Sequence, residues 1–250
     1  AKGIFTKELE TALLDGDIDV AVHSMKDMPS VLPEGLMLAP PPAREDWHDV
    51  LVTAGPLPEK PVIGTGSLRR QVQIRTLYPQ ASLQDIRGNV DTRIRKMKEG
   101  QYDGIIVAAA GLNRLGITED NAGIQITPLV DAFIPAPAQG ILAAELRCQD
   151  TDTLKLLENA ADHTAAIQMK AERRFLVVLE GSCHIPIGAH AQIDGTGIQI
   201  DMVGIYGDEA GKAVSGRFSG PADTPEAVGE ALALRLKADY QKKYPEGSCE

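Results

Sequence analysis

The chain has 250 residues, of which 43% are hydrophobic and 24% are charged, an ordinary composition for a globular protein with room for two or three domains. Its formal net charge of −10 opposes a general affinity for nucleic acid or for an anionic membrane, and no apolar run is long enough to cross a bilayer. The three cysteines, Cys148, Cys183 and Cys249, are too far apart to indicate a disulfide framework or a zinc site. We therefore expect a cytoplasmic protein that holds no metal.

The first part of the chain alternates predicted helices and strands. Helices are expected over 4–14, 68–77 and 90–99, and strands over 18–23, 61–64, 82–86 and 102–110. Gly100 suits the C-terminal cap of the helix that precedes it. This alternation is typical of parallel α/β sheets.

The remainder of the chain has a different order of predicted helices and strands. A short strand at 141–147 and helices at 151–161 and 164–178 are followed by three strands at 187–193, 197–206 and 212–219, and by a helix at 224–243. Asp194-Gly195 between two alternating runs is a strong hairpin signal. We expect a separate α+β domain here.

Positive charge is concentrated in residues 59–100, which carry nine lysines and arginines against four acidic residues, a net charge of +5. Arg69 and Arg70 follow the turn Gly64-Thr-Gly-Ser67, and Arg87 precedes Gly88-Asn89, where the next helix begins. Helix N-termini and arginine forks both favour anions, so we expect these three arginines to contact a small polyanion. Lys96 and Lys98 are instead expected on a solvated helix face.

The stretch His23-Ser-Met-Lys-Asp27 ends the first predicted strand and combines an imidazole, a hydroxyl, an ammonium and a carboxylate. A carboxylate at the carboxyl end of a strand could act as a general acid or base, or stabilise a developing cation. Read alone, the stretch is equally compatible with a loop capped by Asp27.

Seven motifs together resemble the porphobilinogen deaminase (hydroxymethylbilane synthase) family, in that family's order and across the whole chain. They are Lys2-Gly-Ile-Phe-Thr-Lys-Glu-Leu-Glu10, Ala21-Val-His-Ser-Met-Lys-Asp27, Ile63-Gly-Thr-Gly-Ser-Leu-Arg-Arg-Gln71, Ile86-Arg-Gly-Asn-Val90, Ala110-Gly-Leu-Asn-Arg-Leu-Gly116, Pro137-Ala-Gln-Gly140 and Leu179-Glu-Gly-Ser-Cys-His-Ile-Pro-Ile-Gly188. One such motif is weak, whereas seven in order are specific.

The resemblance implies a transferase of tetrapyrrole and haem biosynthesis. It would condense four porphobilinogen molecules head to tail, with loss of ammonia, onto a covalent dipyrromethane cofactor, and then release hydroxymethylbilane by hydrolysis. The implied partners are porphobilinogen and the growing polypyrrole chain, with no nucleic acid and no membrane, in a monomer. Each pyrrole carries an acetate and a propionate, which accounts for a segment of charge +5 in a protein of charge −10.

The resemblance also implies roles for individual residues. Asp27 would be the catalytic carboxylate, which stabilises the azafulvenium left by deamination, and Cys183 would carry the cofactor through a thioether. The implied cofactor-binding residues are Ser24, Lys26, Asp27, Thr65, Ser67, Arg69, Arg70, Arg87 and Gly88. The implied substrate-binding residues are Lys2, Phe5, His23, Arg93, Arg114 and Gln139.

The family fold implied by the resemblance has two α/β lobes like those of type II periplasmic binding proteins, and a C-terminal α+β domain with a three-stranded antiparallel sheet. We place the first lobe at 1–43 and 143–161, the second at 48–136 and the third domain at 164–250, with crossings near 43–48 and 136–142. The family's first strand and helix would precede Ala1, and a chain truncated there is expected to have weak or absent activity and a poorly ordered first lobe.

Two departures from the family pattern are visible. Gly66 stands where the family often has serine, and Ala138 stands where glycine is common. The main alternative function is a two-lobed small-anion-binding protein without catalysis, since such lobes serve many functions. A Cys-His hydrolase is disfavoured, because adjacent side chains at Cys183 and His184 on an extended stretch point in opposite directions.

Overall fold

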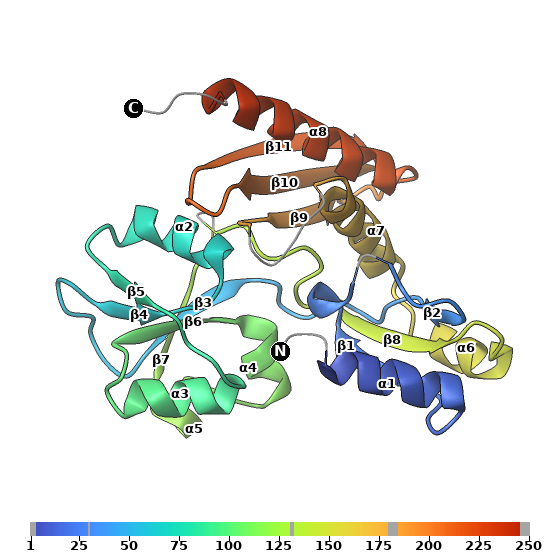
Figure 1. The fold of residues 1–250 in the computed structure, drawn as a ribbon, viewed down its shortest axis with the longest axis horizontal. Helices are drawn as coiled ribbons and strands as arrows, with labels where there is room; N and C mark the ends of the chain where they lie inside the picture. The colour runs from blue at the N-terminus through green and yellow to red at the C-terminus, as the bar shows by residue number, and fades with distance from the viewer. Residues whose placement is uncertain (1–3, 30, 131–132, 180–184, 246–250) are drawn as a thin grey trace.

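Three separate sheets organise the chain in the computed structural model, which describes residues 4–29, 31–130, 133–179 and 185–245. The N-terminal unit lies at the lower right of Figure 1, the second unit at the left, and the C-terminal unit above both. Within the described ranges, no helix is both long enough and apolar enough to cross a membrane.

The first unit is a three-stranded sheet in the order β1-β8-β2, with bounds Ala21–Ser24, Leu142–Arg147 and Leu36–Leu38. Helix α1 (Ile4–Asp15) packs on all three strands, and α6 (Thr151–Glu158) packs on β8. Both pairs are antiparallel, so the parallel sheet predicted from the alternation of elements is wrong here. The reason is that β8 returns from the second unit and runs opposite to both of its neighbours.

The second unit is a five-stranded sheet in the order β5-β4-β6-β3-β7. The strands β4 (Val62–Gly64), β5 (Ser82–Gln84) and β6 (Gly104–Ala108) pair in parallel, as the sequence predicts. The strands β3 (Asp49–Thr53) and β7 (Gln125–Pro128) add antiparallel pairs and were not predicted. The helices are α2 (Leu68–Leu77), α3 (Val90–Lys98), α4 (Ala109–Arg114) and α5 (Glu119–Ala122). The strand predicted over 102–110 is too long, because the chain turns into α4 at Ala109.

The two helices beside the cationic turns begin at side-chain caps. The Ser67 side chain accepts a hydrogen bond from the Arg70 N–H, and the Asn89 side chain accepts one from the Thr92 N–H. Gly88 has φ of 120° and a Cβ there would come within 2.7 Å of Thr92, so only glycine suits that turn. Local sequence therefore fixes both helix starts where they were predicted.

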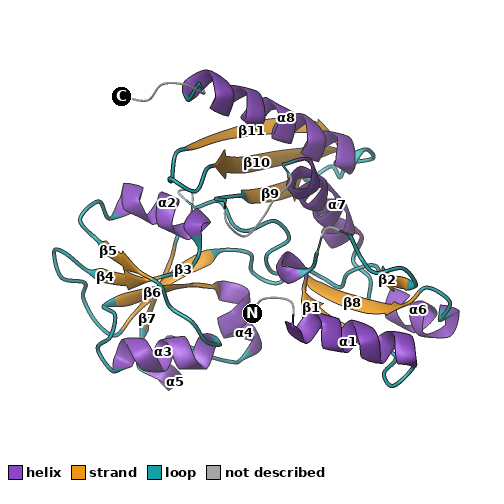
Figure 2. Cartoon of the chain, viewed as in Figure 1, coloured by secondary structure: helices purple, strands orange, loops and turns teal. Residues whose placement is uncertain are grey.

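The third unit is an antiparallel sheet in the order β9-β10-β11, with bounds Gly188–Ile193, Gln199–Gly207 and Ala213–Pro221. Helix α7 (His163–Val178) packs on β9, α8 (Pro225–Lys243) packs on β10 and β11, and the two helices pack on each other, as Figure 2 shows. Phe175, Leu232 and Leu236 are fully buried in this core. The predicted fold class, with two α/β lobes and a C-terminal α+β unit, is confirmed, whereas the domain boundaries stay a prediction.

The chain crosses between the first two units twice, after β2 and before β8 (Figure 1). The Glu45 N–H donates to the Gly140 carbonyl at 3.0 Å, so the two crossing segments, 39–48 and 133–141, lie side by side. Gly140 has φ of 88° and its missing Cβ leaves room for the Glu45 carbonyl. On the first crossing segment the Trp47 ring stacks between His48 and His190 of β9, with ring centroids 3.7 Å apart in both pairs. The crossing is thereby fastened to the third unit.

Candidate active site

The turn that carries Asp27 is a short 3-10 helix, η1 (Met25–Asp27), directly after β1. Met25 is 1% exposed and its N–H donates to the Ile141 carbonyl at 3.0 Å. Arg173 of α7 donates to the Pro29 carbonyl at 2.7 Å, just beyond the turn. Asp27 itself is exposed, and its carboxylate makes no hydrogen bond or ion pair to the residues that the structure describes. The backbone is therefore held while the carboxylate stays available to a ligand.

Lys26 points from the same turn toward the second crossing segment, where its ammonium donates to Gln139 Oε1 at 3.2 Å. Burial and the nearby Arg70 guanidinium together lower the pKa of Lys26 to about 8, against the opposing influence of Asp27 and Asp49. Lys26 is therefore charged at neutral pH and loses its charge as the pH rises through about 8.

Arg69 and Arg70 do not project into open solvent, since they are only 5% and 7% exposed. Both guanidinium groups bind the carboxylate of Asp49, the first residue of β3, through contacts of 2.6 Å from Arg69 Nη1 to Oδ2 and from Arg70 Nη2 to Oδ1. Gln139 Nε2 donates to the same Oδ1 at 3.0 Å. Burial alone would raise the pKa of Asp49, but the two guanidinium groups outweigh it and hold that pKa far below its usual value.

Asp49 is the residue of this cluster that sequence reasoning missed. The available signal was an acidic residue at the head of the apolar run Val50-Leu-Val52, where a carboxylate is expensive to bury unless cations pair with it. Its partners lie twenty and twenty-one residues further along the chain, and no local pattern identifies them.

Arg93 and Arg87 form the outer part of the cationic region. Arg93 Nε donates to the Gly88 carbonyl at 2.7 Å; burial and the nearby Arg70 lower its pKa, while Asp85 and Asp27 act in the opposite direction. Arg93 therefore shares one electrostatic environment with Asp27. Arg87 has a side chain that is 88% exposed and pairs with Asp85 at 3.2 Å.

The two lysines expected on a solvated helix face differ in exposure, and each donates to a backbone carbonyl. Lys96 is partly exposed and donates to the Arg87 carbonyl at 3.0 Å. Lys98 is exposed, yet its ammonium also has a partner, the carbonyl of Ala122.

The turn before α2 uses its hydroxyl groups internally. Thr65 is 1% exposed and its Oγ1 accepts from the Ser67 N–H at 3.3 Å, while Ser67 caps the helix. A Cβ at Gly66 would collide with the Asp85 carboxylate, so glycine makes room there for an acidic neighbour. Because the Asp85 side chain is exposed and can move aside, this contact alone does not require glycine at position 66.

The remaining predicted site residues are dispersed. His23 Nε2 lies 3.1 Å from Glu145 Oε2, and burial together with Glu10 raises the pKa of that glutamate. Arg114 Nη2 donates to the Gly140 carbonyl at 2.7 Å and so binds the crossing segment. Ser24 is the last residue of β1 and precedes η1, where its side chain makes no capping hydrogen bond. Lys2 and Cys183 lie outside the described residues, as does the side chain of Phe5.

Described residues close to both sides of the stretch 180–184, which contains Cys183, are buried in the core of the third unit. Leu179 is 3% exposed and Ile187 is 6% exposed, and both belong to the core of the third unit. A Cβ on Gly188 would lie 2.9 Å from Arg69 Cδ and 2.7 Å from the Pro135 carbonyl. The third unit therefore meets the Arg69 side chain at a residue only five positions after Cys183.

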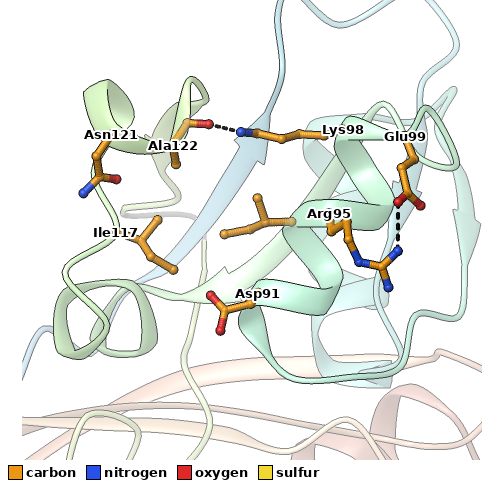
Figure 3. A pocket seen from close by; sticks show the side chains of 8 residues that line it. Asp91, Arg95, Lys98, Glu99, Ile117, Asn121 and Ala122 are labelled. Carbon is orange, nitrogen blue, oxygen red and sulfur yellow. Dashed lines mark hydrogen bonds and ion pairs between the residues drawn. The ribbon is translucent and has the colours of Figure 1, made fainter.

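A hollow of about 450 Å³ lies elsewhere, between α3 and the segment that ends in α5, and is drawn in Figure 3. Asp91 and Glu99 oppose Arg95 and Lys98 in its lining, and Arg95 pairs with Glu99 at 2.8 Å. Because these charges balance, the hollow does not suit a polycarboxylate. In the described part of the chain, no group of three His, Cys, Asp or Glu side chains could hold a metal ion.

Comparison with known proteins gives a consistent result over most of the chain. The family model "Porphobilinogen deaminase, dipyromethane cofactor binding domain" matches residues 1–155, and "Porphobilinogen deaminase, C-terminal domain" matches residues 166–238. A porphobilinogen deaminase of Roseiflexus sp. (strain RS-1) is 46% identical over 242 residues, covering 94% of this chain and 78% of that protein. One from Clostridioides difficile (strain 630) is 43% identical over 249 residues, covering 96% and 80%.

Among solved structures the likeness is weaker. The periplasmic VFT2 domain of Bordetella pertussis BvgS gives a TM-score of 0.41 at 18% identity, covering 67% of this chain and 71% of that one. An ABC transporter structure from Parabacteroides distasonis gives 0.43 at 16% identity, covering 69% and 60%.

Proposed function

The chain belongs to the porphobilinogen deaminase family, and we propose that it makes hydroxymethylbilane by joining four porphobilinogen molecules head to tail with loss of ammonia. It is a transferase of tetrapyrrole biosynthesis with a dipyrromethane cofactor. The observation that carries the proposal is the exposed Asp27 carboxylate beside a group of cations that outnumber their buried counter-ion.

The residues of this site suit a dipyrromethane, which carries several carboxylates. Arg69 and Arg70 share the single carboxylate of Asp49, and the Lys26 ammonium adds a further charge through Gln139. Three cations against one carboxylate leave positive charge for acetate and propionate groups to neutralise. The alternative function, anion binding without catalysis, does not account for an exposed carboxylate at Asp27 that has no partner among the described residues.

We assign roles to the chain's own residues on this basis. Arg69, Arg70 and Lys26 bind the carboxylates nearest the crossing, and the outer Arg87 and Arg93 bind those further out. The remaining implied contacts are kept as proposals: Ser24, Thr65, Ser67 and Gly88 for the cofactor, and Lys2, Phe5, His23, Arg114 and Gln139 for the substrate.

Asp27 is the residue to which we assign the catalytic role. When bound through Cys183, the dipyrromethane supplies the free pyrrole carbon to which the first substrate molecule is joined. The Asp27 carboxylate offsets the positive charge that develops on the substrate ring as ammonia leaves, and it accepts a hydrogen bond from the pyrrole N–H. We further propose a monomer that acts in the cytoplasm, with domains at 1–43 and 143–161, 48–136 and 164–250.

Covalent attachment is tested by replacing Cys183 with serine. The unaltered chain should show a mass excess and the colour that dipyrromethanes give with Ehrlich's reagent, and Cys183→Ser should lose both, because no other residue is assigned the tether. Cys148→Ser, at an exposed free cysteine, is the matched control and should keep both. Absence of any adduct on the unaltered, folded chain would favour the anion-binding alternative.

The catalytic role is tested by Asp27→Asn, which keeps the size of the side chain and removes its charge. Porphobilinogen consumption should fall by roughly 10²-fold or more, while the adduct on Cys183 remains, because the charge is needed in the reaction and not for the fold. Asp17→Asn, at an exposed carboxylate before β1, should be unaffected. Near-normal turnover of Asp27→Asn would remove Asp27 from this role.

A further inference from the structure

The cationic cluster is organised around one residue that none of the family motifs contains. We propose that Asp49 is a positioning residue, which fixes both arginines of α2 and, through Gln139, the ammonium group of Lys26. This inference rests on the proposed function and adds the residue that sets the geometry and charge of its carboxylate-binding site.

The hydrogen bonds of Asp49 use both of its oxygens. Oδ1 accepts from Arg70 Nε at 3.0 Å, from Arg70 Nη2 at 2.6 Å and from Gln139 Nε2 at 3.0 Å, while Oδ2 accepts from Arg69 Nη1 at 2.6 Å. The side chain has no exposed surface. These four hydrogen bonds and its complete burial keep the carboxylate out of contact with solvent and ligand. Asp49 consequently acts on a ligand only through the side chains it holds.

The backbone of Asp49 is held as firmly as its side chain. Asp49 is the first residue of β3, it faces Ala108 in the register with β6, and its carbonyl accepts from the Leu129 N–H at 2.9 Å. It also follows the first crossing segment directly. A carboxylate at this point is fixed to the rigid sheet of the second unit and lies where the chain enters from the first.

The arginines keep donors for a ligand while Asp49 holds them. Arg69 donates from Nη1 to Asp49 and to the Ile134 carbonyl. Its Nε and Nη2 donate to no residue in the described ranges. Arg70 donates from Nη1 to the Ile106 carbonyl at 2.8 Å. Because a guanidinium has five N–H donors in a planar fork, a group anchored on one side can bind a carboxylate with the other.

Gln139 carries the influence of Asp49 across the crossing. Its Nε2 donates to Asp49 in the second unit, and its Oε1 accepts from Lys26 in the first. The same Nε2 also donates to the Trp47 carbonyl at 2.8 Å. The amide is fully buried, so its orientation is determined by these partners. By accepting from Nε2, Asp49 turns the amide so that its oxygen, Oε1, faces the Lys26 ammonium.

The negative charge of Asp49 also affects the pKa of Lys26. Three cations would repel one another in a buried space, and the Asp49 carboxylate offsets part of that repulsion. The charged groups acting on Lys26 are Arg70 and Arg69, which lower its pKa, and Asp27 and Asp49, which raise it, in addition to burial. Removal of the Asp49 charge must therefore make Lys26 lose its proton at lower pH.

The test follows the Nζ signal of Lys26 by NMR in protein labelled with ¹³C and ¹⁵N lysine, assigned by its absence in Lys26→Gln. The midpoint of its titration should lie near pH 8 in the unaltered chain. Asp49→Asn should lower that midpoint by about one pH unit or more, and Arg70→Gln should raise it. Asp103→Asn, at an exposed carboxylate of the same sheet unit, is the matched control and should not move it.

Position and charge are separated by Asp49→Glu, which keeps the charge and displaces the carboxylate. It should leave the Lys26 midpoint near that of the unaltered chain and reduce the adduct on Cys183 about tenfold or more. A folded Asp49→Asn protein with an unchanged Lys26 midpoint overturns the proposal. If Asp49→Asn fails to fold, an unchanged midpoint in Arg70→Gln together with full adduct in Asp49→Glu overturns it.

The titration needs no turnover, so the two proposals fail separately. Lack of adduct on the unaltered chain would refute the proposed function, whereas the sign of the Lys26 shifts decides the role of Asp49.

Discussion

Asp49 and Glu172 are both carboxylates without exposed surface beside the crossing segments, yet their partners differ. Glu172 binds one guanidinium, that of Arg44, at 2.6 and 3.1 Å, and accepts two backbone N–H groups, from Ala138 at 2.5 Å and Ala191 at 2.8 Å. Asp49 binds two guanidinium groups and an amide. The single charges of Glu172 and Arg44 offset each other, whereas Asp49 offsets only one of the two positive charges of Arg69 and Arg70.

Glu172, Arg44 and the two backbone N–H groups connect separate parts of the chain, and we call this group the joint. Arg44 belongs to the first crossing segment, Ala138 to the second, and Ala191 to β9, so Glu172 ties three stretches of chain together. Burial would raise the pKa of Glu172, but Arg44 and His190 outweigh it and lower that pKa to about 2. Burial lowers the pKa of His190, which keeps that imidazole neutral at pH 7 and adds no second cation. The charges of Glu172 and Arg44 therefore offset each other, and this pair leaves no surplus positive charge for an anionic ligand.

The difference teaches that a buried ion pair is not in itself a sign of function. What distinguishes the Asp49 cluster is the surplus of donors and of positive charge, together with an exposed carboxylate at Asp27 close enough to influence both Lys26 and Arg93. The comparison predicts that damage to the joint lowers stability, whereas damage to the cluster changes binding.

The largest expected effect is from Glu172→Gln. Arg44 would remain buried without a counter-charge, so the free energy of unfolding in urea should fall by about 3–5 kcal/mol. Glu230→Gln, which breaks the half-exposed pair of Arg174 and Glu230, is the control and should cost less than about 1 kcal/mol. The fraction that stays folded should keep the Lys26 titration of the unaltered chain. A small stability loss in Glu172→Gln would remove the distinction between joint and cluster.

An intermediate effect is expected from acid. The folded-state pKa of Glu172, about 2, lies below the ordinary value of 4.5, so its contribution to stability is complete above about pH 4.5 and is lost as the pH falls toward 2. Asp49, whose pKa is also lowered, changes stability in the same direction. Urea unfolding at pH 7, 5, 4 and 3 should show a loss of about 2 kcal/mol attributable to Glu172 by pH 3. The loss should be correspondingly smaller in Glu172→Gln, and an equal loss in both proteins would contradict the assignment.

The smallest effect is expected from Ala138→Gly. Ala138 has φ of 60°, the left-handed region that costs a residue with a Cβ about 1–2 kcal/mol. Glycine relieves this, but removes a buried methyl group worth about 0.8 kcal/mol and has more freedom in the unfolded chain. The hydrogen bond to Glu172 is retained, so unfolding in urea should change by less than about 1 kcal/mol. A loss above about 2 kcal/mol would show that the joint depends on that methyl group.

The parts of the structure that the sequence predicted well are those decided by near neighbours. Helix α2 begins and ends at the predicted residues because Ser67 caps it, and Gly100 has the positive φ that its capping position requires. The strands β3 and β7 were missed because their pairing partners lie far along the chain. The same limit applies to the site, since the pairing of Arg69 and Arg70 with Asp49 depends on how β3 is placed against α2.

The chain contains a single tryptophan, and the fold places it where the three units meet. The Trp47 indole is stacked between an imidazole of the first crossing segment and an imidazole of β9, while its carbonyl accepts the hydrogen bond of Gln139. The tryptophan emission of the protein therefore arises wholly from this one junction. A shift or quenching of that emission when a ligand enters would record rearrangement of the junction directly, without any added dye.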